Sequence, residues 1–429
     1  MTLQQVAPVP PLGWNSWDCY GAAVTEAEVR ANAEYMADQL KEYGWEYVVV
    51  DIQWYEPGAV SSAYRPFVPL EMDAYSRLMP AENRFPSAAG GVGFAPLADY
   101  IHSLGLKFGI HIMRGIPRQA AHAATPILGT TATARDIAHT NSICPWNTDM
   151  YGVNADKDGA QAYYNSLFEL YASWGVDFVK VDDIAASKLY DTHLSEIELI
   201  RKAIDQCGRP MVLSLSPGPA PIQYAEALAA YANMWRLTDD FWDQWPQLLD
   251  MFDRCETWQG ISGDGAWPDC DMLPLGHIGI RSVDGGGSDR WTRFTRDEQL
   301  TMMTLWGIFR SPLFFGGELR DNDDWTLALL TNREMLQMHS TSSNVRLIRR
   351  DQHEVIWGAD GAKGESYAAL FNIGELEQHI SVTAEQLGLA GLCQARELWS
   401  GQSLEAGADG SYTLRVPSHG AALIRFDSN

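Results

Sequence analysis

One pattern recurs between residue 7 and about residue 319 and limits the choice of fold: an amphipathic helix, a glycine, and a short apolar strand that ends on a polar residue. Three copies are plain, with helical segments at 36–40, 97–101 and 168–172, glycines at 44, 105 and 175, and strands at 47–51, 107–111 and 178–182. Nearly continuous apolar strands that alternate with helices are typical of a parallel sheet buried on both faces. An α/β fold is therefore predicted for this part of the chain.

The number of strands narrows the architecture. Further candidates lie at residues 12–14, 211–215, 234–238, near 261–267 and near 313–315. Together with the first three they make eight, the number that closes a (β/α)8 TIM barrel. An open doubly wound sheet is the alternative, but no GxGxxG or Walker sequence marks a phosphate-binding turn. Thr25 and Glu28 form a capping box that starts the first long helix.

From about residue 344 the helical spacing disappears. Short alternating segments at 345–348, 354–358, 367–371, 379–382 and 421–426 are separated by glycine-rich turns. This pattern of short alternating segments and turns is typical of a small antiparallel β-sandwich. We therefore predict a catalytic barrel at residues 1–325 and a C-terminal antiparallel β-sandwich domain at 326–429.

Composition excludes several classes of partner. The chain has 31 Lys and Arg against 55 Asp and Glu, a net charge of −24 that repels phosphate backbones and anionic lipids, so neither nucleic acid nor a membrane is an expected partner. No apolar run approaches the ~20 residues that span a bilayer. The N-terminus shows no secretory signal, and the 6 cysteines have no regular spacing, which favours reduced thiols and a cytoplasmic location. The composition is compatible with a homo-oligomer.

Catalytic groups of such barrels lie at the C-terminal ends of the strands. The residues that close the apolar runs include Trp17, Asp51, His111, Asp182, Asp240 and Asp271. Since alternate residues of a strand face the same side, Lys180 is in phase with Asp182, and Arg236 with Asp240. We expect Lys180 to lie beside Asp182 and hold it ionised.

Two carboxylates at the rim of a barrel suit glycoside hydrolysis, in which one acid attacks the anomeric carbon and the other protonates the leaving oxygen. Each acid taken singly could be a solvated loop residue, but two acids in phase with cations favour function. The histidines show no metal-binding spacing such as HExxH. The prediction is a carbohydrate substrate, with no metal and no cofactor.

Several motifs, taken together, resemble glycoside hydrolase family 27, the α-galactosidase family, over nearly the whole chain. The matching stretches are residues 10–17 (PPLGWNSW), 83–87 (NRFPS), 107–110 (KFGI), 180–182 (KVD), 235–236 with Asp240, 267–273 (WPDCDML), 298–299, 305–306 and 311–313. The family is a (β/α)8 barrel with a C-terminal antiparallel β-domain. This agrees with the organisation predicted above.

The resemblance implies roles for the residues at matching positions. Asp182 would be the nucleophile of a retaining, exo-acting enzyme, and Asp240 its general acid and base. Trp17 would form a wall of the sugar-binding subsite, and Asp51 would bind the axial 4-hydroxyl of galactose. Lys180 and Arg236 would bind other sugar hydroxyls. Asp271 and His111, which stands where many relatives have a tyrosine, complete the predicted substrate-binding residues.

The main departure from the family is Ile52. Relatives have a second aspartate there, which binds the 6-hydroxyl of galactose, and isoleucine cannot accept that hydrogen bond. β-L-Arabinopyranose has the shape of α-D-galactopyranose without its CH2OH group. The resemblance therefore implies an α-D-galactosidase, with β-L-arabinopyranosidase as the alternative that Ile52 favours and α-N-acetylgalactosaminidase less favoured. Alternatively, Ile52 only packs in the barrel and Gln53 reaches the 6-hydroxyl.

A second departure lies between Arg114 and Tyr151, where a stretch containing residues 144–147 (CPWN) replaces the family's loop. Ile184 stands where relatives have a cysteine after the nucleophile, so the disulfide often found beside the site is not expected. Two other functions are considered, a non-catalytic sugar-binding module and a transglycosylase that uses the same two acids.

Overall fold

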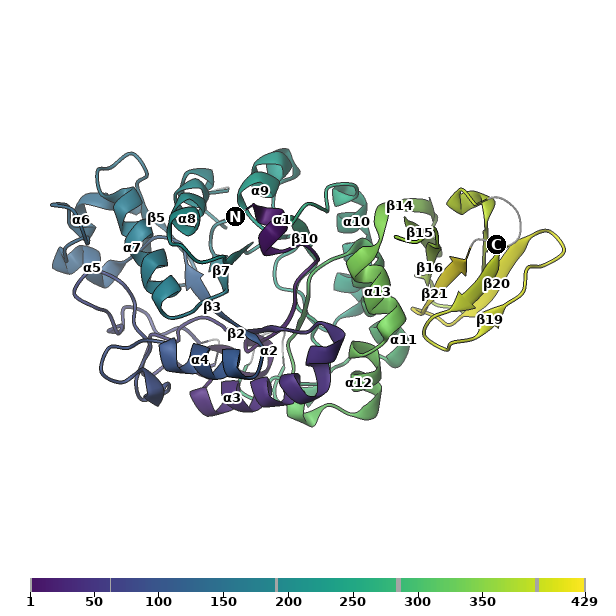
Figure 1. Ribbon diagram of the computed structural model, residues 1–429, viewed down its shortest axis with the longest axis horizontal. Coiled ribbons are helices and arrows are strands. Elements are labelled where there is room, and N and C mark those ends of the chain that lie inside the picture. Colours follow the sequence, from purple (N-terminus) through teal and green to yellow (C-terminus); the bar gives the residue numbers. More distant parts are fainter. Residues whose placement is uncertain (1, 62, 190–191, 283–286, 390–392, 428–429) are drawn as a thin grey trace.

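A sheet of eight parallel strands forms the first part of the molecule, and helices surround it (Figure 1). The computed structural model describes residues 2–61, 63–189, 192–282, 287–389 and 393–427. The strand order is β10-β9-β8-β7-β3-β2-β1-β13. The strands are β1 (Leu12–Asn15), β2 (Tyr47–Val50), β3 (Lys107–Met113), β7 (Phe178–Asp182), β8 (Val212–Leu215), β9 (Met234–Arg236), β10 (Trp267–Asp269) and β13 (Leu313–Phe315).

A parallel bridge between Leu273 and Phe315 joins the two ends of this sheet. The amide of Leu273 donates to the carbonyl oxygen of Phe314 at 2.7 Å. Because the segment after β10 is thereby tied to β13, the sheet closes on itself as the predicted barrel.

Each barrel strand is followed by a helix on the outside of the barrel, as predicted. The principal helices are α3 (Glu26–Tyr35), α4 (Ala95–Ser103), α7 (Ala160–Ser173), α8 (Leu194–Gln206), α9 (Ala225–Tyr231), α10 (Trp245–Trp258), α11 (Arg296–Phe309) and α13 (Arg333–Thr341). The capping box predicted at Thr25 and Glu28 is present at the start of α3. It satisfies amides that the first helical turn leaves without a partner.

One strand prediction was wrong. The segment near 261–267 was expected to be the seventh strand, but β10 begins only at Trp267. Gly263 and Ala266 instead pair across a tight turn in which Asp264 has φ 52° and Gly265 φ 86°. Apolar residues at the beginning of this segment do not reveal such a turn, so the strand was placed too early.

Insertions between the barrel elements carry smaller structures. A three-stranded sheet, in the order β4-β6-β5, lies in the stretch where the chain departs from its family's pattern. The added elements are α2 (Trp17–Tyr20), β4 (Ile116–Pro117), α5 (Arg118–Ala123), α6 (Ala134–Ile137), β5 (Ala138–Ile143), β6 (Met150–Val153), β11 (His277–Ile278), β12 (Arg290–Trp291) and α12 (Asp324–Leu330).

The C-terminal part is the predicted antiparallel β-sandwich. A six-stranded sheet in the order β14-β15-β16-β21-β18-β19 packs against a pair, β17 and β20. The strands are β14 (Ser343–Arg350), β15 (Glu354–Asp360), β16 (Ser366–Asn372), β17 (Gln378–Thr383), β18 (Gln394–Glu397), β19 (Ser403–Leu404), β20 (Ser411–Val416) and β21 (Ala421–Asp427). The predicted boundary at 325/326 falls within α12 and stays a prediction.

The central strands β15 and β16 of the larger C-terminal sheet are buried on both faces. Trp357 and Phe371 belong to the core of the barrel, whereas Ile356 and Leu370, one position earlier on the same strands, belong to the core of the sandwich. Since neighbouring residues of a strand face opposite sides, one face packs on the barrel and the other on the second sheet. Phe371 meets Phe252 of α10 edge-on, with ring centroids 5.0 Å apart.

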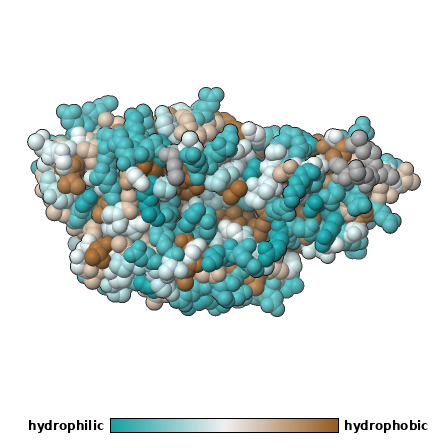
Figure 2. Space-filling model, in the orientation of Figure 1, coloured by the Kyte–Doolittle hydropathy of each residue, from teal (hydrophilic) through white to brown (hydrophobic). Residues whose placement is uncertain are grey.

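The surface is largely hydrophilic on the face shown in Figure 2, with apolar groups scattered among the polar ones. Within the ranges that the structure describes, no helix is both long and apolar enough to cross a membrane.

Candidate active site

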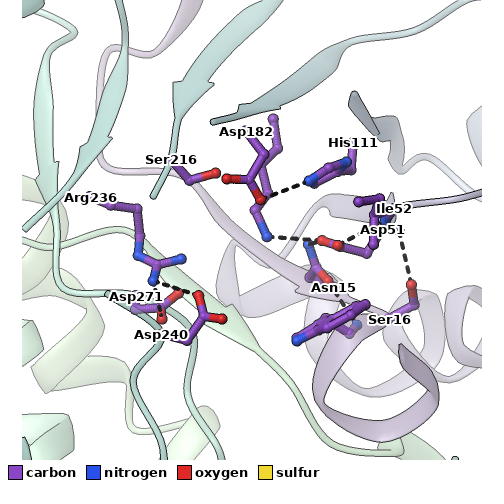
Figure 3. A network of polar contacts seen from close by, with 12 residues as sticks. Asn15, Ser16, Asp51, Ile52, His111, Asp182, Ser216, Arg236, Asp240 and Asp271 are labelled. Atoms are coloured by element: carbon purple, nitrogen blue, oxygen red, sulfur yellow. Dashed lines mark hydrogen bonds and ion pairs between the residues drawn. The ribbon is translucent and has the colours of Figure 1, made fainter. Parts of the chain in front are cut away.

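One cavity at the C-terminal ends of the barrel strands gathers the predicted site residues. Trp17, Asp51, Ile52, Lys180, Asp182, Arg236, Asp240 and Asp271 all line it. His111 lies behind the cavity wall, with a fully buried side chain, and reaches the site through Asp182. Figure 3 shows these side chains converging from different strands, with Asp182, His111 and Asp51 in one group and Arg236, Asp240 and Asp271 in another.

The group around Asp51 is an almost fully buried carboxylate surrounded by donors. Asn15 Nδ2 donates to Oδ2 at 2.8 Å, Lys180 Nζ donates to the same oxygen at 3.0 Å, and the amide of Ile52 donates to Oδ1 at 2.8 Å. Burial alone would raise the pKa of Asp51, but the charge of Lys180 and these hydrogen bonds hold that pKa well below its ordinary value. Asp51 is therefore a fixed hydrogen-bond acceptor at the bottom of the cavity.

The prediction for Lys180 and Asp182 is confirmed in part, because the charge of Lys180 lowers the pKa of Asp182 but its hydrogen bond goes to another carboxylate. Lys180, which was expected to pair with Asp182, makes its hydrogen bond with Asp51. It is instead Nε2 of His111 that donates to Oδ2 of Asp182, at 3.1 Å. Residues two apart on a strand share a face without having to touch. The ladder aligns His111 of β3 with Lys180 of β7 and Met113 with Asp182, so the contact between His111 and Asp182 runs diagonally between the two strands.

Asp182 is kept in its ionised form by several groups. Burial raises its pKa, but the hydrogen bond and charge of His111, the charge of Lys180 and the amide of Asp183 lower the pKa below its ordinary value. The Asp183 amide donates to Oδ1 at 2.8 Å. A carboxylate that is ionised and 16% exposed can act as a nucleophile towards a group bound in the cavity.

The second group is centred on Arg236, at the end of β9. Its Nη2 lies 2.8 Å from Oδ2 of Asp271 and 3.1 Å from Oδ1 of Asp240. The expected contact of Arg236 with Asp240 is therefore present, although β9 ends at Arg236 and Asp240 lies in the segment that follows, outside the predicted strand phase. Asp271 is buried and also accepts a hydrogen bond from the amide of Phe241 at 2.8 Å. Asp240 has a 56% exposed side chain, so its carboxylate faces the solvent.

Asp18 is a site residue that the sequence analysis missed. It lines the same cavity, is only 3% exposed, and its Oδ2 has no hydrogen-bond partner within the part of the chain that the structure describes. Burial and the charge of Asp271 raise its pKa well above the ordinary value. Its position directly after Trp17, at the end of the first strand, could have identified it.

Gln53, considered as an alternative ligand for a sugar hydroxyl, does not line this cavity. It has a positive φ of 64° and its Nε2 donates to Oδ2 of Asp149 at 3.0 Å. Ile52 does line the cavity, beside Asp51, and is 2% exposed. An apolar side chain therefore occupies the position next to the main acceptor.

None of the 6 cysteines, all of which lie among the described residues, lines this cavity or forms a disulfide bond. Cys255 and Cys270 approach each other to 3.7 Å between their sulfur atoms. No set of three or more His, Cys, Asp or Glu side chains among the described residues is arranged to hold a metal ion.

Known proteins match this chain in both of its parts. A family model described as alpha galactosidase A matches residues 148–340, and one described as the alpha galactosidase C-terminal beta sandwich domain matches residues 351–426. A GH27 β-L-arabinopyranosidase from Geobacillus stearothermophilus, solved as a variant in complex with arabinose, is 65% identical, with a TM-score of 0.97 over 100% of this chain and 99% of that chain. The chain belongs to glycoside hydrolase family 27. This confirms the resemblance found in its motifs.

Other relatives of this family 27 glycoside hydrolase differ in the activity given in their names. A Bacillus halodurans chain, provisionally described as an α-N-acetylgalactosaminidase, is 59% identical with a TM-score of 0.90 over 100% of both chains. Alpha-galactosidase A of Cellvibrio japonicus is 26% identical over 365 residues, which is 81% of this chain and 71% of the relative. The family thus establishes a glycosyl hydrolase that acts on a carbohydrate.

Proposed function

We propose that this family 27 enzyme is a retaining, exo-acting β-L-arabinopyranosidase. The observation that carries the proposal is Ile52, a buried apolar side chain in the cavity beside Asp51. A galactose 6-hydroxyl buried against it without a partner would cost about 1–3 kcal/mol. β-L-Arabinopyranose has no CH2OH group and avoids this cost. The 65% identity to a GH27 β-L-arabinopyranosidase supports the same substrate.

In the proposed reaction Asp182 is the nucleophile. Its carboxylate forms a bond to the anomeric carbon while the bond from that carbon to the leaving oxygen breaks, and Asp240 gives a proton to that oxygen. Asp240 then takes a proton from water, which attacks the anomeric carbon and releases Asp182. The hydrogen bond from His111 supports the nucleophilic role, because it favours the ionised form of Asp182.

The remaining groups would hold the sugar. Asp51 and Lys180, joined at 3.0 Å, offer an acceptor and a donor to neighbouring hydroxyls such as the axial 4-hydroxyl. Arg236 with Asp271 offers a second such pair at 2.8 Å. Trp17 would cover one face of the ring. Both pairs bind hydroxyls that arabinopyranose and galactose share, so the choice between these sugars falls to Ile52.

Hydrolysis of two aryl glycosides tests the substrate. We expect kcat/KM for p-nitrophenyl β-L-arabinopyranoside to exceed that for p-nitrophenyl α-D-galactopyranoside by about 5- to 150-fold, the ratio that corresponds to about 1–3 kcal/mol. Ile52→Asp should move the preference towards the galactoside, whereas Ile52→Leu, the matched control, should not. A wild-type enzyme that prefers the galactoside would refute the substrate assignment.

α-D-Galactosidase activity is the second candidate, favoured by the names of relatives such as that from Cellvibrio japonicus and by the acceptor Asp51. The provisional name of the Bacillus halodurans chain adds α-N-acetylgalactosaminide cleavage to the comparison. The segment 185–196, which would meet the 2-substituent of that sugar, lies partly outside the described residues. The corresponding p-nitrophenyl glycoside is therefore included as a third substrate in the same assay.

A further inference from the structure

Asp183, the residue that directly follows the proposed nucleophile, has a left-handed backbone conformation with φ 55°. Glycine reaches this region freely, whereas the Cβ atom of other residues crowds the backbone there, and aspartate is tolerated mainly when its short side chain is hydrogen-bonded. The side chain of Asp183 is 2% exposed and does not line the active-site cavity. A disfavoured conformation persists only where its surroundings hold it, and next to an active site it indicates a function.

The conformation of Asp183 directs its amide towards the nucleophile. This amide donates to Oδ1 of Asp182 at 2.8 Å, while Nε2 of His111 donates to Oδ2 at 3.1 Å. Both oxygens of the carboxylate are therefore held, and the Asp183 amide is one of the groups that lower the pKa of Asp182. A change in φ of Asp183 would turn this amide away or displace the segment that follows it.

Arg114, which directly follows β3, binds both sides of this φ angle. Its Nε donates to the carbonyl oxygen of Asp183 at 2.6 Å, and its Nη2 donates to Oδ2 of the same residue at 3.0 Å. The amide of Arg114 donates to the carbonyl oxygen of Asp182 at 3.0 Å. Arg114 thus holds the peptide group before Asp183 and the groups attached to its Cα atom. Because the guanidinium is a planar fork of donors, it fixes their relative orientation.

A second carboxylate, Glu196 in the first turn of α8, holds Arg114 in place. Its Oε1 accepts a hydrogen bond from Nη1 of Arg114 at 3.1 Å, and its Oε2 accepts one from the hydroxyl of Tyr164 at 2.6 Å. The side chains of Arg114 and Glu196 are only 2% and 4% exposed. Removing such charges from water is costly, and well-packed apolar side chains would often stabilise a fold equally or better. Stability alone therefore does not account for this buried cluster.

We propose that Asp183 and Arg114 are positioning residues for the nucleophile. The ion pair between them holds Asp183 in the left-handed conformation, and this conformation keeps the Asp183 amide on Oδ1 of Asp182. Glu196 supports the ion pair from the other side. The inference rests on the proposed function only for the role of Asp182 as nucleophile, and it is independent of which sugar is bound.

Alanine and glycine at position 183 test the proposal, because both remove the carboxylate but only glycine adopts a positive φ freely. The assay is kcat/KM on 2,4-dinitrophenyl β-L-arabinopyranoside, at pH 8 because burial raises the pKa of Asp183 to about 6. For Asp183→Gly we expect a loss of only about two- to fivefold, the cost of the extra freedom of glycine. Asp183→Ala should lose a further factor of about 5 to 30, which corresponds to about 1–2 kcal/mol.

The pH profile is a readout that a change in folding alone would not move. In Asp183→Ala the amide leaves Oδ1 of Asp182, so the pKa of Asp182 rises and the acid limb of kcat/KM lies at higher pH than in Asp183→Gly. Both variants lack the Asp183 carboxylate and keep His111 and Lys180, so these charges do not contribute to the difference. Equal kcat/KM values and equal acid limbs in the two variants would overturn the proposal.

Asn344, at the start of β14, offers a matched control outside the cavity. It also has a positive φ, 50°, and its side chain donates to Asp360 at 2.8 Å. Asn344→Ala should be less stable in urea than Asn344→Gly for the same backbone reason, but the two should have the same kcat/KM and the same acid limb. A difference in kcat/KM between them would show that lowered stability, and not the position of Asp182, explains the result at position 183.

Removal of Arg114 tests whether the ion pair is what holds Asp183. Arg114→Met combined with Glu196→Gln should lower kcat/KM about tenfold in the otherwise wild-type chain but only about twofold in Asp183→Gly, because glycine does not need to be held. Equal factors in the two backgrounds would mean that Arg114 supports the fold without acting through Asp183. If these variants show no cooperative urea transition, the comparison of alanine with glycine at position 183 decides on its own.

Failure of this inference and failure of the proposed function give different results. Asp182→Ala should abolish hydrolysis of the dinitrophenyl glycoside, and turnover like that of the wild type would refute the nucleophilic role itself. If Asp182→Ala is inactive while Asp183→Ala and Asp183→Gly are equal, only the positioning role fails. The ratio of the two Asp183 variants is also measured with 2,4-dinitrophenyl α-D-galactopyranoside, so that the outcome does not depend on which sugar the enzyme prefers.

Discussion

Replacing His111 by phenylalanine removes one hydrogen bond from Asp182, the proposed nucleophile, and should change the pH dependence of the enzyme. His111 Nε2 donates to Oδ2 of Asp182 at 3.1 Å, and its side chain is fully buried. Phenylalanine keeps an aromatic ring in this space but has no donor. A hydrogen bond to a charged group contributes about 1.5–3 kcal/mol, so its loss destabilises the carboxylate relative to the protonated acid.

The sign of the effect follows from the direction of the pKa shift. His111 lowers the pKa of Asp182, so removing it raises that pKa, and the acid limb of the pH profile moves to higher pH. Below this limb kcat/KM follows the ionised fraction of Asp182, and we expect it to fall by about 10- to 150-fold, the equivalent of about 1.5–3 kcal/mol. On the plateau of the profile, at higher pH, Asp182 is ionised in both enzymes, and the loss of kcat/KM should be smaller.

The assay is kcat/KM against pH with a 2,4-dinitrophenyl glycoside, whose leaving group needs little protonation, so that Asp240 contributes little to the profile. His111→Tyr restores a hydroxyl donor and should return the limb towards the wild-type position. His339→Phe, at a buried histidine outside the site, controls for loss of stability. An acid limb that does not move in His111→Phe, or that moves to lower pH, would refute the reasoning.

Three further predictions concern the charged groups of the cavity. Asp240→Asn should lose far more kcat/KM on glycosides with basic leaving groups than on the dinitrophenyl glycoside, because the latter needs little protonation; equal losses would contradict the acid role. Lys180→Met should lower the free energy of unfolding in urea by about 3–5 kcal/mol at pH 7, because it leaves the buried carboxylate of Asp51 without its cation. Since the pKa of Asp51 is lowered in the fold, the stability that this pair contributes is lost on acidification, and the difference between variant and wild type should shrink at low pH. Asp18→Asn should keep most of the activity at pH 7, because burial raises the pKa of Asp18 and favours the neutral carboxyl group that asparagine resembles; a large loss would show that the ionised form is needed.

Most of the barrel could be predicted because each strand leaves a local signal. Residues 47–50 and 178–182 are short, apolar and preceded by a glycine, and the structure places both in the sheet as β2 and β7. The strand near residue 267 left a weaker signal. It is only three residues long, and the turn before it depends on positive φ at Asp264 and Gly265. Apolar periodicity does not reveal such backbone conformations.

The members of the site were more predictable than their contacts. Strand phase correctly identified the side of the strand on which Lys180 and Asp182 lie, but the partner of each is set by a neighbouring strand. Whether Lys180 or Asp182 contacts His111 depends on how far β3 and β7 are shifted along each other. Such a shift, the stagger of neighbouring strands, is a property of the assembled barrel. The burial of Asp18 likewise depends on Gly316, a residue distant in sequence, on which a Cβ would lie 2.0 Å from the Asp18 carboxylate.

The burial of β15 and β16 on both faces of the larger C-terminal sheet has a consequence for how the chain unfolds. Its inner face supplies Trp357 and Phe371 to the same core that holds the barrel, and Phe252 and Phe309 of helices α10 and α11 pack against those rings. A barrel cut free of the sandwich would present these aromatic side chains to water and to other chains. The sandwich therefore keeps these aromatic side chains of the barrel buried. We expect the two parts to unfold in a single cooperative transition.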